Sequence, residues 1–274
     1  MDIRALLLAG RERLSKANIE SASLEASLFL THLTGYNRSR LIAHDDEVLS
    51  SEVITQYQEL IDKRILGMPC AYLLGYKDFW GLSLKVNAYT LIPRPDTETL
   101  VEEALKLKPH KALDLGTGSG AIILALKSEL KDLEAHACDF SKGALDVACE
   151  NAHNLNLEVH FYESSWFTNI PPQQFDLIVS NPPYIEANDP HLQLNGLNFE
   201  PQTALVSGVD GLDDIRLIAK TAPKYLERGG YLMFEHGYDQ GERVRAILKA
   251  NGFVNVETVK DLGGNDRVTK GCKH

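Results

Sequence analysis

Apolar residues recur at helical spacing over the first quarter of the chain. Three runs place them three or four positions apart, at residues 3–14, 24–33 and 53–65. The loop signals Gly35-Tyr36-Asn37 and His44-Asp45-Asp46 separate these runs. The pattern predicts a small helical bundle over residues 1–74, because each run offers an apolar face to the others.

The pattern changes at Gly67-Met68-Pro69, which ends the last of these helices. Residues 72–91 are rich in aromatic and β-branched side chains, which is typical of a short β-hairpin. We expect a hairpin linker over residues 75–92 and a second domain over 93–274. That domain begins with a helix, which Asp96 or Thr97 can cap.

Strands and helices then alternate. Apolar strand-like runs lie at residues 111–115, 134–138, 158–162, 175–179 and 230–235, and helical runs lie at 120–129, 142–155, 213–226 and 240–250. Two further strand-like runs, at 253–259 and 266–270, would close the sheet with an antiparallel hairpin. This order predicts an α/β fold with a mostly parallel, Rossmann-like sheet.

Composition and charge narrow the choice of partner. The 274 residues are 44% hydrophobic and 24% charged, as in ordinary globular proteins. There are 28 Lys and Arg against 38 Asp and Glu, a net charge of -10, which disfavours a long contact with a phosphate backbone. The charges of the predicted bundle have the character of solvated helix faces. A protein or small-molecule substrate is favoured.

Four cysteines, Cys70, Cys138, Cys149 and Cys272, are widely separated and form no metal-binding pattern. We therefore expect reduced thiols and no metal. The apolar run near the start, residues 5–9, is too short for a signal peptide or a membrane span. A cytoplasmic protein that does not contact a membrane is expected.

Three glycines, Gly116, Gly118 and Gly120, lie between a predicted strand and a predicted helix. Glycine allows the backbone to turn tightly there and to approach a ligand closely. A nucleotide-like cofactor is the natural ligand. Gly116, Gly118 and Ala121 also satisfy the dinucleotide-binding spacing, so a nicotinamide cofactor is an alternative.

Two acids accompany this turn. Asp139 ends the next predicted strand, where a carboxylate can accept hydrogen bonds from both ribose hydroxyls of a nucleotide. It could instead cap the following helix. Asp114 precedes the first glycine and could orient the turn, receive the cationic end of a cofactor or bond the loop backbone.

The segment Phe175 to Tyr184 reads FDLIVSNPPY. Its apolar part is typical of a buried parallel strand, and the prolines end that strand at Asn181. Ligands of open α/β sheets bind at the carboxyl edge, so Asn181 to Tyr184 are expected to lie in a cleft. A plain strand-ending turn is the alternative interpretation.

Together these residues resemble the class I S-adenosylmethionine-dependent methyltransferases, and within them the PrmC/HemK family. The resemblance covers nearly the whole chain. Its most specific pieces are Leu91-Ile92-Pro93-Arg94-Pro95-Asp96-Thr97-Glu98, Asp114-Leu115-Gly116-Thr117-Gly118-Ser119-Gly120 and Ser180-Asn181-Pro182-Pro183-Tyr184-Ile185. Further matches are Phe199-Glu200-Pro201, Asp210-Gly211-Leu212 and Asp261-Leu262-Gly263-Gly264-Asn265-Asp266-Arg267.

The resemblance implies methylation of the side-chain amide nitrogen (N5) of the glutamine in the Gly-Gly-Gln motif of class 1 peptide chain release factors, which tunes translation termination. It implies S-adenosyl-L-methionine as cofactor, S-adenosyl-L-homocysteine as product and the helical bundle as substrate-recognition domain. A monomer without direct nucleic-acid contact is expected.

The resemblance also implies site residues. The implied cofactor-binding residues are Asp114, Gly116, Thr117, Gly118, Ser119, Gly120, Asp139, Trp166 and Asn181. Among them, Trp166 would lie near the adenine, although it could equally be a core tryptophan. The implied substrate-binding residues are Asn181, Pro182, Pro183, Tyr184, Arg94 and Glu200. Arg94 could contact the substrate protein or bridge to an acid, and Glu200 could help a loop close over the peptide.

The chemistry gives three of these residues catalytic roles. An amide nitrogen is a poor nucleophile because its lone pair is delocalised into the carbonyl. If the Asn181 side-chain oxygen and the Pro182 carbonyl each accept one N–H of the glutamine amide, the lone pair can point at the methyl group. Tyr184 would pack against the flat amide. Alignment of this kind can lower a barrier by roughly 7–11 kcal/mol.

Three other functions fit parts of the sequence. Asn-Pro-Pro-Tyr also serves enzymes that methylate adenine or guanine amino groups in nucleic acid, where Tyr184 would stack on a flipped base. A non-catalytic adaptor would use only the helical bundle. A nicotinamide dehydrogenase would leave Asn181 to Tyr184 and Asp114 without a role.

Overall fold

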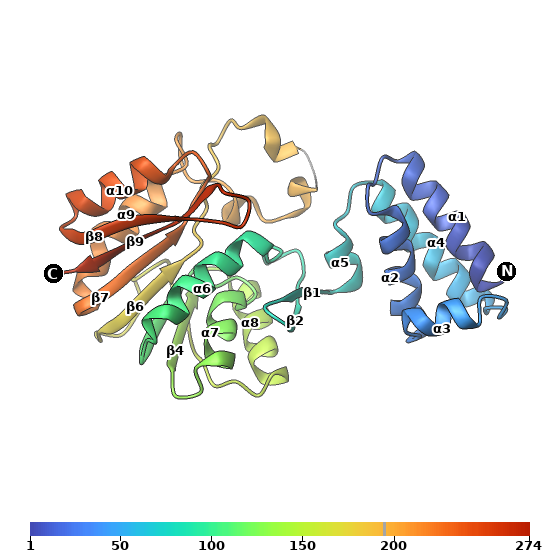
Figure 1. The fold of residues 1–274 in the computed structure, drawn as a ribbon, viewed down its shortest axis with the longest axis horizontal. Helices are drawn as coiled ribbons and strands as arrows, with labels where there is room; N and C mark the ends of the chain where they lie inside the picture. The colour runs from blue at the N-terminus through green and yellow to red at the C-terminus, as the bar shows by residue number, and fades with distance from the viewer. Residues whose placement is uncertain (194–195) are drawn as a thin grey trace. The chain divides into compact units, whose positions relative to one another are not determined.

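The computed structural model describes residues 1–193 and 196–274, which form two compact units, Met1–Gly75 and Tyr76–His274 (Figure 1). The first unit is helical. Its helices are α1 (Ile3–Lys16), α2 (Ala22–Thr34), α3 (Arg38–Ala43), α4 (Ser51–Ile65) and α5 (Cys70–Leu74). The first, second and fourth correspond to the three apolar runs, whereas α3 and α5 were not predicted.

The core of the first unit joins α1, α2 and α4. Ile3, Phe29, Tyr57 and Ile61 are almost fully buried there. Ion pairs cover its surface and join Arg4 to Asp45, Arg13 to Asp62, Lys16 to Glu12, Arg40 to Glu47 and Arg64 to Glu25. The basic residues in these pairs therefore belong to neutralised helix faces.

The second unit begins with a two-stranded hairpin and continues as a three-layer α/β fold. The hairpin strands are β1 (Tyr76–Phe79) and β2 (Leu82–Lys85). The strands of the large sheet are β3 (Lys111–Leu115), β4 (Glu134–Asp139), β5 (His160–Glu163), β6 (Phe175–Ser180), β7 (Leu226–Glu235), β8 (Phe253–Lys260) and β9 (Asp266–Lys273). Its helices are α6 (Glu98–Leu107), α7 (Ala121–Glu129), α8 (Lys142–Asn154), α9 (Asp213–Thr221) and α10 (Gly241–Ala250).

The large sheet has the order β5-β4-β3-β6-β7-β9-β8. Neighbours from β5 to β7 pair in parallel, and β9 pairs antiparallel with both β7 and β8. The predicted fold class, a mostly parallel sheet with a C-terminal antiparallel hairpin and an N-terminal helical domain, is confirmed. None of the described helices is long and apolar enough to cross a membrane.

The two faces of the sheet enter two separate cores. Along β6, Leu177 and Val179 belong to the core on the side of α6, α7 and α8, whereas Ile178 belongs to the core on the side of α9 and α10 (Figure 1). Phe175 lies in the same core as Ile178 because the pairing is irregular between Phe175 and Leu177. This two-sided burial explains why the strand sequence is apolar apart from Asp176 and Ser180.

The strand register brings three loops together. Leu115 of β3 pairs with Cys138 of β4 on one side and with Ser180 of β6 on the other. The next residues in the three strands are Gly116, Asp139 and Asn181. Because these strands are parallel, all three loops leave the sheet at its carboxyl edge, where the site is built.

Two local predictions were wrong. The helix predicted over residues 213–226 ends at Thr221, because Pro223 lies in the short 3-10 helix Ala222–Lys224 and β7 starts at Leu226. Thr97 occupies the N-cap position of α6, but it has helical backbone angles and its side chain makes no capping hydrogen bond.

Candidate active site

A cavity of about 470 Å³ opens at the carboxyl edge of the large sheet. Its walls come from the turn after β3, the end of β4, the segment after β5, the Asn-Pro-Pro-Tyr segment after β6, and the stretch that follows the hairpin. This volume suits a nucleotide-sized ligand.

Bonds to β4 hold the glycine turn in place. The backbone N–H groups of Gly116 and Thr117 both donate to the carbonyl of Cys138, at 2.9 Å. Gly116 and Gly118 have φ of 72° and 57°, and Gly120 has φ of 85°, all in the left-handed region. The three glycines are therefore required by the backbone conformation of the turn.

Asp139 joins the glycine turn to the start of α8. Its Oδ2 accepts the Gly118 N–H and its Oδ1 accepts the Ser141 N–H, both at 2.9 Å. Burial raises the pKa of Asp139, and backbone N–H groups partly oppose this rise. The helix cap is Ser141, whose hydroxyl accepts from the Ala144 N–H at 3.3 Å. Asp139 lines the cavity and keeps lone pairs for a further donor.

Asp114 lies beneath the turn and is fully buried. Its Oδ2 accepts the Thr117 hydroxyl at 2.6 Å. Its Oδ1 makes no regular hydrogen bond to any described residue, although the backbone N–H of Ile123 also favours the charged carboxylate. Burial raises the pKa of Asp114 to about 7. A buried carboxylate oxygen without a regular hydrogen-bond partner favours a cationic or hydrogen-bond-donating group nearby.

Trp166 forms a wall of the same cavity. A Cβ on Gly116 would lie 3.2 Å from its ring, so the ring packs directly against the turn. Its indole N–H donates to Asp214 at 3.1 Å, and its backbone has φ of 49°, unusual for a bulky residue. The ring is half-buried and borders the cavity.

Asn181 is the polar side chain of the segment after β6. Its Nδ2 donates to the Thr97 hydroxyl oxygen at 3.3 Å. Its Oδ1 is buried and has no hydrogen-bond partner among residues 1–193 and 196–274. A second cavity, of about 190 Å³, also reaches Asn181, together with Tyr184. Asn181 thus borders both cavities.

Hydrogen bonds to Glu235 and Gln240 hold Tyr184, the last residue of the Asn-Pro-Pro-Tyr segment. The Tyr184 hydroxyl donates to Glu235 at 3.4 Å, and the Tyr184 carbonyl accepts from the Gln240 side-chain amide at 3.0 Å. Burial raises the pKa of Tyr184, and the negative charge of Glu235 raises it further. Pro183 lines the first cavity, whereas Pro182, expected to bind the substrate, lines neither cavity.

Arg94 and Glu200 meet at the rim. They form an ion pair, and Glu200 also accepts the Ile92 N–H at 3.0 Å. Glu200 is buried, whereas Arg94 is about one-third exposed and lines both cavities. The alternative in which Arg94 bridges to an acid is the arrangement observed.

Sequence reasoning missed several residues at the site. Phe140 and Tyr89 line the larger cavity, and both are largely exposed. Asn151 of α8 is buried, donates to the Ser119 carbonyl at 2.8 Å and exchanges two hydrogen bonds with the Lys85 backbone. Phe140 could have been predicted to line the site, because it directly follows Asp139. Asn151 could not, because its position in the sequence is that of an ordinary polar residue in a helix.

The described part of the chain holds no group of three or more His, Cys, Asp or Glu side chains suited to a metal ion.

Two family models match the chain. The PrmC N-terminal domain matches residues 5–75, and the methyltransferase small domain matches residues 95–196. Among solved structures, a methyltransferase from Pyrococcus furiosus shares the fold with a TM-score of 0.53 and 16% identity, over 70% of this chain and 89% of that one.

Two curated relatives are similar over nearly their whole length. The release factor glutamine methyltransferase of Vibrio cholerae is 47% identical over 98% of this chain and 96% of its own. The protein of the same name from Escherichia coli is 45% identical over 95% of this chain and 96% of its own.

The fold, the glycine turn and the cavity at the carboxyl edge define a methyltransferase of the α/β class. With the similarity to the curated relatives, the chain belongs to the release factor glutamine methyltransferase family.

Proposed function

We propose that the protein transfers a methyl group from S-adenosyl-L-methionine to the side-chain amide nitrogen of the glutamine in the Gly-Gly-Gln motif of class 1 release factors. The observation that carries the proposal is the Asn181 Oδ1, a buried acceptor without a partner among the described residues, at the border of two cavities. Such an orphan acceptor fits a ligand that brings an N–H group.

The larger cavity fits the methyl donor. Gly116 to Gly120 would surround its methionine part, and the spare lone pairs of Asp139 would accept the ribose hydroxyls. Asp114, buried beneath the turn and bonded to Thr117, would act on the amino-acid end only through the turn. Trp166, together with Phe140, would contact the adenine. When bound, the cofactor supplies an electrophilic methyl group on a sulfonium.

The smaller cavity would admit the glutamine side chain. Its amide would donate one N–H to Asn181 Oδ1 and the other to the Pro182 carbonyl, with the Tyr184 ring against its plane. Pro182 fixes φ and lacks an N–H, so its carbonyl is held with little loss of entropy. The two acceptors stabilise the positive charge that develops on nitrogen, an effect larger in a site closed to water.

The amide nitrogen would form a bond to the methyl carbon and afterwards release one proton to solvent. The electrons of the broken carbon–sulfur bond would stay with the donor, which would leave as a neutral thioether. Asn181 and Pro182 would orient the nitrogen during this transfer, whereas Arg94, held by its ion pair with the buried Glu200, would contact the peptide at the rim.

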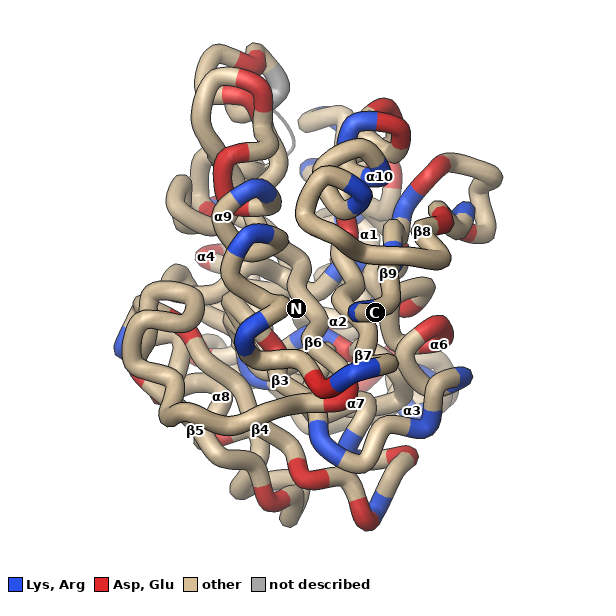
Figure 2. Tube along the Cα trace, turned by 90° about the vertical axis from the view of Figure 1, so that its left-hand side faces the viewer, with Lys and Arg blue, Asp and Glu red and all other residues tan. Residues whose placement is uncertain are grey.

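The partner would be a release factor, bound by residues 1–74 as a substrate-recognition domain, with residues 75–92 as linker and 93–274 as catalytic domain. The protein would act in the cytoplasm as a monomer without direct nucleic-acid contact. In support, acidic and basic residues are interspersed in the described chain, as along α9 (Figure 2).

The test is incubation of the purified protein with labelled S-adenosyl-L-methionine and, in parallel, a class 1 release factor, tRNA and DNA. Label on the release factor alone is expected. Label on nucleic acid alone would show an adenine or guanine methyltransferase, and label on none of the three would favour the adaptor.

A further inference from the structure

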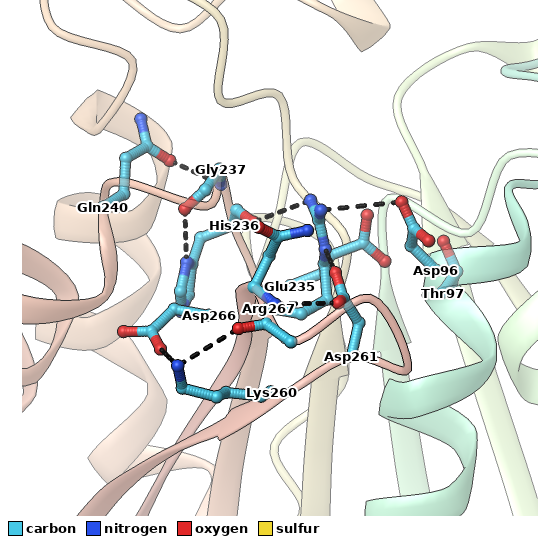
Figure 3. A network of polar contacts seen from close by, with 12 residues as sticks. Asp96, Thr97, Glu235, His236, Gly237, Gln240, Lys260, Asp261, Asp266 and Arg267 are labelled. Carbon is cyan, nitrogen blue, oxygen red and sulfur yellow. Dashed lines mark hydrogen bonds and ion pairs between the residues drawn. The ribbon is translucent and has the colours of Figure 1, made fainter.

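A buried polar network lies behind Asn181 and Tyr184 (Figure 3). Its central group is Glu235, the last residue of β7, which is only 1% exposed. Glu235 Oε1 accepts the Tyr184 hydroxyl at 3.4 Å, and Oε2 has no regular hydrogen-bond partner in the described chain. Glu235 lines neither cavity. It therefore does not touch a ligand and can act only through other residues.

Thr97 connects this carboxylate to the site. The Thr97 side chain is buried, and its oxygen accepts the Asn181 Nδ2 at 3.3 Å. Its hydroxyl lies close enough to lower the pKa of the Glu235 carboxyl, although no regular hydrogen bond joins the two among the described residues. Because Thr97 makes no capping bond to α6, its hydroxyl hydrogen is free to turn toward this carboxylate.

The donor and acceptor capacities fix one arrangement. An ionised carboxylate only accepts, so the single hydroxyl hydrogen of Thr97 points to Glu235. The Thr97 oxygen must then receive a hydrogen from Asn181, which places Nδ2 toward Thr97 and Oδ1 on the opposite side of the side-chain amide. The flipped side-chain amide would set two acceptor oxygens against each other.

We propose that Glu235 and Thr97 are positioning residues that hold the side-chain amide of Asn181 with its oxygen toward the glutamine substrate. This inference rests on the proposed function for the identity of the substrate, but the orientation of Asn181 is a property of the protein alone.

Charged groups around Glu235 decide whether it is ionised. Burial raises the pKa of Glu235 to about 7 and Asp96 raises it further, whereas Arg267 and the hydroxyls of Thr97 and Tyr184 lower it. Ion pairs and a carbonyl hold Arg267, whose guanidinium meets Asp261 at 3.1 Å, Asp96 at 3.5 Å and the His236 carbonyl at 3.3 Å (Figure 3). Burial lowers the pKa of His236, which is therefore neutral at pH 8. At pH 8 the carboxylate is ionised and accepts only.

The orientation is tested by NMR on the full chain at pH 8, labelled with ¹⁵N at the asparagine side-chain amides. The Asn181 pair is the one missing from the Asn181→Ala spectrum. Thr97→Val and Glu235→Gln are expected to shift this pair, whereas Thr97→Ser, which keeps the hydroxyl, leaves it near its original position. A pair that is unmoved in Thr97→Val would overturn the relay. This readout needs neither cofactor nor substrate, so it stands even if the release factor is not methylated.

Kinetics give the second readout. Thr97→Val is expected to lower kcat about tenfold, equivalent to about 1.4 kcal/mol, with the cofactor dissociation constant changed less than about twofold, and Thr97→Ser to recover most of the loss. Thr99→Val, the same change on the same helix at a side chain without a hydrogen bond among the described residues, is the matched control. Because both residues act through one relay, Thr97→Val and Glu235→Gln together should lose no more than the worse single variant. Fully additive losses, or equal losses in Thr97→Val and Thr99→Val, would overturn the proposal.

Discussion

Asn181→Ala is expected to lower turnover while leaving the fold intact or more stable. In the free protein the Asn181 Oδ1 is buried and unpartnered among the described residues, which costs about 1–3 kcal/mol. The Nδ2 hydrogen bond to Thr97 returns about 0.5–1.5 kcal/mol. Removing both groups should therefore change the free energy of unfolding by between about 0.5 kcal/mol of destabilisation and about 2.5 kcal/mol of stabilisation.

The turnover of Asn181→Ala is expected to fall, although its stability does not fall markedly. Removing a preorganised group that stabilises developing charge typically lowers kcat by about 10²–10³, or 2.7–4 kcal/mol. We expect a loss of about a hundredfold or more, with cofactor affinity changed only several-fold, because the donor cavity keeps Asp139 and the glycine turn.

The assay combines release factor methylation, calorimetric cofactor binding and urea unfolding. Asn169→Ala, whose side chain lies outside both cavities and bonds the Glu163 carbonyl, is the matched control. Equal losses of turnover and cofactor affinity in Asn181→Ala, or a marked drop in its stability, would refute this reasoning.

Three further predictions follow from buried contacts. Tyr57→Phe should stabilise the protein by about 1 kcal/mol in thermal unfolding, because the Tyr57 hydroxyl is buried without a partner among the described residues. Gly211→Ala should reduce kcat far more than Gly229→Ala: both glycines have positive φ, but only at Gly211 would a Cβ lie 2.2 Å from the Tyr184 carbonyl oxygen. Burial raises the pKa of Asp114 to about 7, so the folded state binds a proton that the unfolded state releases near pH 4. The wild type should lose stability relative to Asp114→Asn as pH rises from about 4 to 7, by urea unfolding.

Each of these predictions has a control. Tyr36→Phe should destabilise, since its hydroxyl donates to Glu47 at 2.8 Å, and a stabilisation as large as that of Tyr57→Phe would contradict the first. Similar kcat in the two glycine variants would contradict the second. A stability difference that does not change with pH would contradict the third.

Much of the fold follows from sequence pattern alone. The strand predicted at residues 111–115 coincides with β3, because a short apolar run between turn residues usually forms a buried strand. Helix α3 escaped detection because it has six residues and buries only Leu41, too little for a periodic signal. Helix α9 was extended past Thr221 because the apolar spacing continued into Pro223 and beyond.

Site residues could be predicted from the sequence where they lie at the carboxyl end of a strand. Asn181 and Asp139 could be placed because the carboxyl edge of a parallel sheet gathers such residues. Thr97 was misread as a cap because its contact with Asn181 joins positions 84 residues apart. Glu235 was read only as the end of a strand, since no spacing reveals that its carboxyl group is buried against Tyr184.

Tandem mass spectrometry of a class 1 release factor, after incubation with the protein and S-adenosyl-L-methionine, identifies the atom that receives the methyl group. We expect one methyl group, on the side-chain amide nitrogen of the glutamine in the Gly-Gly-Gln motif, and none with Asn181→Ala over the same short incubation. A methyl group on any other residue, or an unmodified release factor in the presence of active, correctly folded protein, would contradict this expectation.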